Sequence, residues 1–481
     1  AGGRKSGTVT SIAPRAVGRV LPTLNEDGSR LWIRPKPAYG RWWKRRRALA
    51  YALMAVYLAI PHLRLGGKPL ILLDAPRRHF TIFGYTFLPT DTALFMLFLG
   101  IVIVAIFLLT ALFGRVWCGW GCPQTVWMEF LFRPLERLIE GGRTGSLAID
   151  RSRNHLHPRR LLKFAVYGVI SLLLGHTFLA YFVGVDQLRV WVTRSPLEHP
   201  ASFAVMAVTS ALVFADFAYF REQVCTIACL YGRWQSALLD SSSLVVAYDY
   251  RRGEPRARGL KPRPEGAGDC IDCGNCITTC PTGIDIRNGL QMECIHCTQC
   301  IDACDAVMDR IGRPRGLIRY TSLDELAGKR RRLWRPRTIA YPVVLAVFVG
   351  VFTQQLVAKP AADIVVLRGP GAPYTIEPDG RVLNHVRVKV TNRSARRATY
   401  RIAIEGVEEA TVVAPPLPLI AEPGQSSEVS LFILLPERQF SGGRRDIVVV
   451  VRDDEQLDAR IAWTLFGPQS RGIEPQNEKA R

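Results

Sequence analysis

Long apolar runs divide the chain. Five stretches of roughly twenty residues carry few or no charges, which is the length that a helix needs to cross a bilayer; they cover residues 48–63, 92–113, 161–184, 201–220 and 338–358. The first run is short and follows the basic sequence RWWKRRR, as a signal or interfacial segment would, but no small-residue cleavage site follows it. We therefore expect a membrane anchor there, and the pattern as a whole predicts a bundle of five transmembrane helices.

Beyond the last apolar run, the spacing of the apolar residues changes to the alternation that is typical of β-strands. Between residues 363 and 468, short alternating or β-branched runs such as RVLNHVRVKVTN and RDIVVVVRD are separated by the turn sequences EPDG, EPGQS and SGG. About seven such runs in about a hundred residues are typical of an immunoglobulin-like β-sandwich. We expect this domain to mediate contact rather than chemistry, with His385 in a structural or surface role. The polar tail, 469–481, is predicted to be disordered.

Lys and Arg residues cluster on alternate connections between the apolar runs. Segments 34–47, 115–163 and 221–337 hold 35 of them, whereas segments 64–90 and 185–200 hold six. Because basic residues near span ends remain on the cytoplasmic side, we expect the N-terminus inside and the sandwich outside. This bias accounts for much of the net charge of +22. Nucleic-acid binding would also explain the charge, but the chain shows no recognition motif, and we expect no nucleic-acid partner.

These patterns predict a multidomain membrane protein. Its expected parts, in chain order, are a cytoplasmic basic N-terminal segment (1–47), transmembrane helices one to four (48–235), a cytoplasmic cysteine-rich domain (236–337), a fifth transmembrane helix (338–358), the outer sandwich (363–468) and the tail (469–481).

Cysteine usage agrees with this orientation. All twelve cysteines lie between residues 118 and 304, in or beside segments predicted to be inside, and the 119 residues from Asp363 onward contain none. Reduced thiols on the cytoplasmic side, with no cysteine in the oxidising compartment, favour metal ligation over disulfides.

Eight of the cysteines form two consecutive ferredoxin motifs. The sequences CIDCGNCITTCP, from residue 270, and CIHCTQCIDACD, from residue 294, share the spacing C-x2-C-x2-C-x3-C, in which the fourth cysteine ligates the neighbouring cluster. The spacing predicts two [4Fe-4S] clusters with crossed ligands: Cys270, Cys273, Cys276 and Cys304 for cluster 1, and Cys294, Cys297, Cys300 and Cys280 for cluster 2. Two four-cysteine zinc sites are the alternative. Asp305 replaces the proline of the second motif, which leaves the ligand count intact.

Two such clusters close together indicate electron transfer, because neither offers an open coordination position for a substrate. The cysteine-rich domain is therefore expected to conduct electrons. We find no nucleotide-binding glycine motif that would identify the electron donor.

The other four cysteines form two pairs of identical spacing, Cys118 and Cys122 in RVWCGWGCP, and Cys225 and Cys229 in VCTIACLYGRW. Predicted spans two and four run in the same direction, so both pairs are expected at the cytoplasmic boundary. If the chain stays helical through each pair, its cysteines share one face and the four thiolates can converge. Three interpretations stay open: packing as small apolar groups, a redox-active dithiol, and binding of copper or another metal centre.

Few other ionisable groups lie within the predicted spans. His176 and Asp216 do, and groups at such a depth are functional candidates. His176 with His62 is the one pairing that would suit a b-type haem. His155 and His157, just before the third span, suit either transient metal binding or a solvated basic loop.

Several long strings together resemble a known family. FGRVWCGWGCPQTVW, FREQVCTIACLYGRWQS, the two ferredoxin motifs and GLIRY resemble the FixG/RdxA/CcoG family, the cytochrome c oxidase accessory proteins of bacterial inner membranes. The resemblance implies a polyferredoxin-type membrane protein with a periplasmic FixG-type immunoglobulin-like domain. One departure concerns the family pattern C-x3-C-P: Pro123 follows the first pair, but Leu230 follows the second, which puts the local geometry of that pair in question.

The resemblance also implies an activity. It suggests a cupric reductase that supplies Cu(I) for assembly of cbb3-type cytochrome oxidase, with oxidase subunits or copper chaperones as partners. Copper would be the substrate or a bound ion at Cys118, Cys122, Cys225 and Cys229, with His176, His155 and His157 as further candidate ligands. Soft thiolates prefer Cu(I), which makes this chemistry reasonable. Two alternatives remain: a quinol-linked electron conduit of the NapH or NosR kind, and a non-catalytic scaffold for oxidase assembly.

Overall fold

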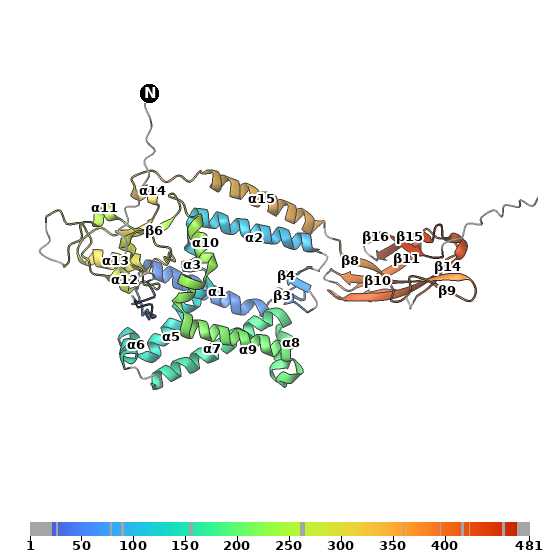
Figure 1. The fold of residues 1–481 in the computed structure, drawn as a ribbon, viewed down its shortest axis with the longest axis horizontal. Coiled ribbons are helices and arrows are strands. Elements are labelled where there is room, and N and C mark those ends of the chain that lie inside the picture. Colours follow the sequence, from blue (N-terminus) through green and yellow to red (C-terminus); the bar gives the residue numbers. More distant parts are fainter. Residues whose placement is uncertain are drawn as a thin grey trace, which may run out of the picture. The chain divides into compact units, whose positions relative to one another are not determined.

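The computed structural model describes residues 22–468, with gaps at 26, 77–78, 88–90, 153–156, 260–264, 359, 395, 415–417, 423 and 455–456. His155 and the tail predicted to be disordered lie outside the described residues. Contacts divide the chain into two compact units (Figure 1): the first combines Ala1–Leu63 with Thr92–Phe352, and the second combines Arg64–Asp91 with Thr353–Arg481.

Four helices of the described chain are long and apolar enough to cross a membrane. They are α2 (Thr92–Phe113), α7 (Pro158–Val183), α9 (Pro200–Ala215), which a π-helical turn extends to Phe220, and α15 (Pro336–Val357). They nearly coincide with the last four predicted spans. At most a third of the most apolar stretch of each helix is buried, so these side chains face outward and require a lipid environment.

The first predicted span corresponds to α1 (Arg41–Ala59), which ends in the 3-10 turn Ile60–His62. This helix is not among the four membrane candidates, because its first two turns contain the basic residues of RWWKRRR. The first of the five predicted spans thus stays a prediction. The N-terminus of α1 is held in place by Asp302, whose carboxylate accepts hydrogen bonds from the backbone N–H groups of Trp42 and Trp43, at 3.2 and 2.7 Å.

Shorter helical segments connect the long helices. They are α3 (Val116–Trp120), α4 (Pro123–Trp127), the π-helical turn Met128–Phe132, α5 (Arg133–Glu140), α6 (Gly142–Arg151), α8 (Val185–Val192), the π-helical turn Val224–Ala228 and α10 (Leu230–Leu238). Helices α7 and α9 pack closely because Gly175 has no side chain to collide with Ser210. The rings of Phe132 and Phe217 stack with their centroids 4.1 Å apart, in a buried cluster that includes side chains of α7.

The cysteine-rich domain belongs to the same unit as the membrane helices. Its small antiparallel sheet pairs β6 (Val245–Tyr248) with β7 (Ile318–Thr321), and its helices are α11 (Tyr250–Gly253), α12 (Asn275–Thr278), α13 (Gln299–Arg310) and α14 (Leu323–Leu326). Apolar side chains of β6, β7 and α13 pack around the cysteines in one core. Most of the ferredoxin cysteines thus lie in a largely apolar interior.

The second unit contains the predicted β-sandwich. One sheet has the order β12-β14-β10-β8, with β9 also paired to β10, and the other has the order β13-β11-β15-β16. The strands are β8 (Ala362–Arg368), β9 (Thr375–Ile376), β10 (Arg381–Asn392), β11 (Ala398–Glu405), β12 (Thr411–Val413), β13 (Leu419–Ala421), β14 (Ser426–Pro436), β15 (Arg444–Asp453) and β16 (Asp458–Phe466). Burial alternates along β10 and β14, as a strand with one face in the core requires.

Residues 64–91, which the sequence analysis assigned to the membrane region without further structure, contribute short strands to this second unit. They are β1 (Arg64–Leu65), β2 (Lys68–Pro69), β3 (Ile71–Asp74), β4 (His79–Ile82) and β5 (Tyr85–Phe87), and β3, β4 and β5 form a three-stranded sheet. Within the unit, Arg393 forms an ion pair with Asp91 at 3.0 Å.

The two sheets are linked by a buried amide. Asn384 of β10 donates a hydrogen bond to the backbone carbonyl of Phe466 at 2.8 Å and accepts one from its N–H at 2.9 Å. We predict that Asn384→Ala destabilises the sandwich by about 1–3 kcal/mol, because both backbone groups lose their partner. Thermal unfolding of the full chain measures this. The control is Thr464→Ala, which removes an exposed hydrogen bond to Asp446; equal melting temperatures for the two variants would contradict the prediction.

Candidate redox site

The structure gathers the eight ferredoxin cysteines into two groups. Each group lines its own cavity, and the groups are those of the crossed pattern: Cys270, Cys273, Cys276 and Cys304 line one, and Cys280, Cys294, Cys297 and Cys300 line the other, where Cys276 also reaches the wall. The remaining walls are mainly apolar, with Val307 and Leu317 in the first cavity and Val246 and Ile284 in the second. Four thiols around a mainly apolar cavity fit a four-iron cluster in each place.

The two groups differ in their access to solvent. Cys273 of the first group is exposed, whereas Cys294 and Cys297 of the second are buried. We call the first group the outer site and the second the inner site. Burial raises the pKa of the Cys294 and Cys297 thiols to about 12. Thiolates can therefore accumulate there only beside compensating positive charge, such as that of iron.

Asp305, which replaces the expected proline, has a structural role. Its carboxylate accepts a hydrogen bond from the backbone N–H of Gly316 at 2.9 Å, so it closes the loop that follows α13. The preceding residue, the predicted ligand Cys304, lies on the wall of the outer site.

Neither boundary pair lies on one continuous helix, contrary to the arrangement considered from the sequence. Cys118 belongs to α3, but Cys122 has extended backbone (φ −62°, ψ 127°) and precedes α4. Likewise Cys225 lies in a π-helical turn, and Cys229 has extended backbone (φ −74°, ψ 102°) and precedes α10. The second cysteine of each pair therefore lies just before the start of a new helix. Gly121 separates the two helical segments in the first pair, and the π-helical turn ends before Cys229 in the second.

Leu230, which stands in place of the expected proline, starts a helix directly after an extended cysteine, as Pro123 does in the first pair. Pro123 occupies the first position of α4, and Leu230 occupies the first position of α10. That position needs no backbone N–H and suits either residue. Leu230 is 78% exposed, so its side chain does not alter the packing of the second pair.

The four boundary thiols nevertheless approach one another. Burial raises the pKa of the Cys225 thiol, and the neighbouring Cys122, Cys118 and Cys229 raise it further, which requires all four to be close in space. Burial likewise raises the pKa of Cys118 to about 11, although Arg115 opposes this. We call these four residues the boundary thiols.

A polar network surrounds Cys118. Its thiol donates a hydrogen bond to the Gln235 side-chain oxygen at 3.0 Å, and the Gln235 amide donates to Tyr231 at 2.7 Å and to Thr110 at 3.2 Å. Gln235 and Thr110 are almost fully buried. This network connects α2, α3 and α10 and fixes the orientation of the thiol.

The boundary thiols pack directly against the inner site. Cys118, Ile295 and Cys297 share one apolar cluster, with Cys225 at its edge. Gly119 makes this approach possible, because a methyl group at that position would lie 2.5 Å from the Ile295 carbonyl oxygen and 2.9 Å from the Cys297 Cα. Backbone of the first pair therefore touches backbone of the second ferredoxin motif.

Hydrogen bonds secure the same contact from the side. Trp120 donates to the Tyr320 hydroxyl at 3.1 Å, and this hydroxyl donates to the His296 carbonyl at 3.1 Å. The His296 ring accepts a hydrogen bond from the backbone N–H of Arg115 at 3.1 Å. Burial lowers the pKa of His296 to about 3, with Arg115 contributing, so the ring stays neutral. Neutral polar contacts thus hold the loop between Cys294 and Cys297.

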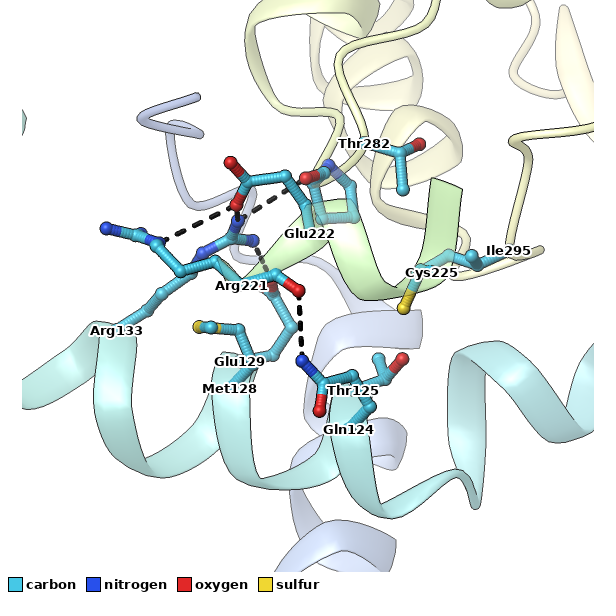
Figure 2. Close-up of a pocket in the computed structure, with 11 residues that line it drawn as sticks. Gln124, Thr125, Met128, Glu129, Arg133, Arg221, Glu222, Cys225, Thr282 and Ile295 are labelled. Atoms are coloured by element: carbon cyan, nitrogen blue, oxygen red, sulfur yellow. Dashed lines mark hydrogen bonds and ion pairs between the residues drawn. The ribbon is translucent and has the colours of Figure 1, made fainter. Parts of the chain in front are cut away.

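A buried ion network underlies the second pair (Figure 2). Arg133 pairs with Glu129 and with Glu222, at 3.0 Å for the latter, and its guanidinium also donates to the Pro281 carbonyl, at 3.3 Å, directly after Cys280. Figure 2 shows Arg133, Glu129 and Glu222 on one side of a small cavity whose lining includes Cys225 and Gln124. The network thus joins α5, the second pair and the inner-site loop.

Glu136 is the centre of the adjoining charges. It accepts hydrogen bonds from Arg221, at 3.0 Å to each oxygen, from Lys163 at 3.2 Å, and from Arg34. Burial alone would raise the pKa of Glu136, but Arg221, Arg34 and Lys163 hold it well below its usual range. Arg221 has φ +56°, a backbone conformation that is strained for a side chain of this size and that this pairing stabilises.

Among the described residues, no group of three or more His, Cys, Asp or Glu side chains is close enough to hold a single metal ion. The ligands of a four-iron cluster bind different iron atoms and lie further apart, so this finding agrees with the cavities above. For copper it means that a site using all the boundary thiols would need them to close around the ion.

The histidine candidates lie elsewhere. His176, in α7, and His199 line a separate cavity, and the His176 ring N–H donates a hydrogen bond to the Leu172 carbonyl of its own helix, at 2.8 Å. The ring of His157 accepts a hydrogen bond from the Arg159 N–H at the start of α7. His62 ends the 3-10 turn after α1 and does not line the cavity of His176.

Sequence reasoning missed the ion network and the role of Gly119. Arg221 and Glu222 lie just before the second cysteine pair, and Glu129 and Arg133 lie shortly after the first. Charged residues that flank a membrane span normally face water, and their burial depends on partners some 85 to 89 residues away in the chain.

Fold and site together define a membrane iron–sulfur electron-transfer protein with an oxidoreductase-like arrangement. Family models agree: residues 93–140 match a 4Fe-4S binding domain, residues 220–323 match a 4Fe-4S dicluster domain, and residues 352–468 match the Ig-like fold at the C-terminus of FixG. The last match identifies the sandwich as immunoglobulin-like.

Curated relatives extend these matches over most of the chain. The protein RdxA of Cereibacter sphaeroides is 39% identical over 76% of this chain and 79% of its own length. The nitrogen fixation protein FixG of Rhizobium meliloti is 31% identical over 93% of this chain and 94% of its own length. The chain belongs to the FixG/RdxA family. A solved FixG-related protein from Vibrio parahaemolyticus aligns with 22% of this chain and 97% of its own, at 15% identity and a TM-score of 0.21.

We predict that Gly119→Ala disturbs the inner site, because the added methyl group collides with Ile295 and Cys297. The variant should lose about half of the bound iron, corresponding to one of two clusters. Iron analysis with electron paramagnetic resonance of the reduced protein measures this. Gly168→Ala in α7, where a methyl group meets nothing within 4 Å, is the control. Full iron content and an unchanged spectrum in Gly119→Ala would contradict the described packing.

Removing the charge of Glu136 should destabilise the first unit strongly. Glu136→Gln removes the buried carboxylate that Arg221, Arg34 and Lys163 share, at a cost of about 3–5 kcal/mol. Each cation then keeps only its second acidic partner, which is Glu222, Asp150 and Glu140 respectively. Tryptophan fluorescence during thermal unfolding in detergent reports this. The control, Glu198→Gln, breaks an exposed pair with Arg194 and should cost less than about 1 kcal/mol.

The same carboxylate predicts a pH dependence. Because the folded-state pKa of Glu136 is lowered, its contribution is present above the ordinary glutamate value and is lost as pH falls toward the folded-state pKa. The wild-type melting temperature should therefore fall more steeply on acidification than that of Glu136→Gln. Parallel slopes would show that the pKa of Glu136 is not lowered in the folded protein.

Proposed function

We propose that this protein is a membrane-bound cupric reductase that supplies Cu(I) for assembly of cbb3-type cytochrome oxidase. One observation carries the proposal: the boundary thiols, which are soft ligands suited to Cu(I), pack against the inner site through Gly119 and Cys297. An electron donor site and a copper-binding group in direct contact are what a metal reductase requires.

In this proposal the crossed cysteine groups hold two [4Fe-4S] clusters. Cys270, Cys273, Cys276 and Cys304 would bind the cluster of the outer site, and Cys294, Cys297, Cys300 and Cys280 that of the inner site. When bound, such clusters supply one-electron transfer. The protein's own part is to exclude water with apolar walls and to fix the thiols with the hydrogen bonds around His296.

Copper is the substrate at the boundary thiols, Cys118, Cys122, Cys225 and Cys229. Cu(II) accepts one electron and becomes Cu(I), which thiolates bind more strongly. The raised pKa of Cys118 means that its proton leaves only when a cation binds, so copper binding releases protons here. Gln235, which accepts the Cys118 proton in a hydrogen bond, directs the thiol in the free protein. His176, His155 and His157 are not needed for this step.

The proposed setting is the bacterial inner membrane. The distribution of Lys and Arg supports an N-terminus in the cytoplasm and, with α1 as a fifth span, a periplasmic immunoglobulin-like domain. Oxidase subunits or copper chaperones are the proposed partners of that domain, and lipid surrounds the outward-facing apolar helices.

Copper reduction by the purified, chemically reduced protein tests this function. Wild-type protein should be reoxidised by Cu(II) in proportion to the Cu(I) captured by a chelator. Cys118→Ser and Cys225→Ser should slow the reaction at least tenfold while the iron content is unchanged, because they remove copper ligands and leave the ferredoxin cysteines. Leu230→Pro, which keeps the extended Cys229 and the start of α10, is the control and should react like wild type.

Other outcomes separate the alternatives. If the clusters stay reduced in the presence of Cu(II), the protein is not a cupric reductase. A scaffold without catalysis is indicated if Cys276→Ser and Cys297→Ser abolish the cluster absorbance while oxidase assembly continues.

A further inference from the structure

The largest of the described cavities lies among the membrane helices. It has a volume of about 450 Å³, within the range of about 300–1,000 Å³ that small-molecule sites occupy. Its walls come from α1, α3, α4, α7, α9 and the π-helical turn that follows α9. All of these elements belong to the first unit.

The lining of this cavity is mainly aromatic and aliphatic. Tyr57, Trp117, Trp127, Phe178 and Phe217 contribute rings to it. Trp117 and Phe178 remain 49% and 36% exposed, and Phe178 lies within a candidate membrane span, so the cavity is open toward lipid. A flat apolar ring with a hydrocarbon tail can therefore enter it from the bilayer.

Two polar side chains meet at one wall. Asp216 accepts a hydrogen bond from the Gln124 amide at 2.9 Å, and the same amide donates to the Arg221 carbonyl at 3.0 Å. Asp216 begins the π-helical turn Asp216–Phe220, a local distortion of the kind that is frequent at functional sites. A carboxylate inside a membrane span is costly and is a functional candidate.

This wall is also next to the redox groups. Gly121, Pro123 and Gln124 line the cavity and enclose Cys122 in the sequence. Gln124 reaches a second cavity as well, the one in Figure 2, whose lining includes Cys225 and the carboxylates of Glu129 and Glu222. Electrons and protons can thus leave a bound molecule through neighbouring groups.

We infer that this cavity binds a membrane quinol, the electron donor of the protein. The quinol ring stacks among the aromatic side chains, one hydroxyl donates to Asp216, and the tail extends into the lipid. Oxidation yields the quinone, two electrons and two protons: Asp216 takes one proton, water takes the other, and two one-electron acceptors of the iron–sulfur class take one electron each. A two-electron donor and a one-electron substrate such as Cu(II) explain why two such acceptors are built in.

The site goes beyond the proposed copper chemistry and rests on it only for the destination of the electrons. Binding can therefore be tested separately. The probe is a photoreactive azido-ubiquinone, applied to the full-length protein in lipid nanodiscs. We expect labelling of peptides containing Trp117–Trp127 or Thr209–Phe217, and competition by decylubiquinone but not by excess phospholipid.

Two variants with a matched control sharpen the test. Val213→Trp fills the cavity and should reduce labelling at least tenfold, whereas Leu212→Trp, at a position of the same helix that is 65% exposed and outside the lining, should leave it unchanged. Asp216→Asn, which keeps the shape of the wall, should slow reduction of the iron–sulfur absorbance by decylubiquinol more than tenfold while labelling persists.

Several results would overturn the inference. Labelling that Val213→Trp does not reduce, or that phospholipid displaces as well as decylubiquinone does, would mean that the cavity holds no quinone or only an acyl chain. If Val213→Trp does not fold, an unchanged rate of reduction by decylubiquinol in Asp216→Asn would equally overturn the quinol site. Copper reduction by chemically reduced protein remains measurable in every case, so failure of the quinol site and failure of the proposed function are distinguishable.

Discussion

The contact between Gly119 and Cys297 is the constraint on which the rest of the site depends. A side chain as small as a methyl group at position 119 would collide with the loop of the inner site, so the membrane-boundary segment and the ferredoxin loop meet backbone to backbone. The boundary thiols gain their position from this approach. Electron transfer falls steeply with distance, and this contact removes any intervening layer of side chains.

The buried charges serve the same contact from a second direction. Arg133 binds both Glu222, beside the second pair, and the Pro281 carbonyl, beside Cys280. Buried ion pairs contribute little net stability when compared with apolar residues, but they define one arrangement because a charge without its partner is costly. We infer that the main role of the network is to hold α5, the second pair and the inner site in a single relative position.

Much of this architecture follows from the sequence. The apolar runs predict four of the long helices almost to the residue, since length and hydrophobicity suffice for a span. The alternating runs predict the sandwich, and the ferredoxin spacing predicts the crossed cysteine groups, because both depend on local patterns. In the sandwich, these local patterns do not predict the hydrogen bond by which Asn384 links the two sheets, because its partner Phe466 is 82 residues away in the chain.

The rest depends on contacts that no local pattern contains. The boundary pairs share the spacing of a helix face, yet the chain leaves the helix at Cys122 and Cys229 because new helices begin at the next residue. Leu230 can replace proline since only the first helical position is involved. Likewise Asp216 appears in the sequence as an isolated acid in a span, and only the fold places it opposite Gln124 at the wall of a cavity.

Rapid freeze-quench electron paramagnetic resonance tests the central claim most directly, namely that electrons pass between the inner site and copper at the boundary thiols. Reduced protein is mixed with two equivalents of Cu(II), one for each reduced cluster, and the signals of Cu(II) and of the reduced clusters are followed together. The account predicts that both signals disappear at the same rate, and that Cys118→Ser slows both equally. Loss of the Cu(II) signal while the clusters remain reduced would contradict it.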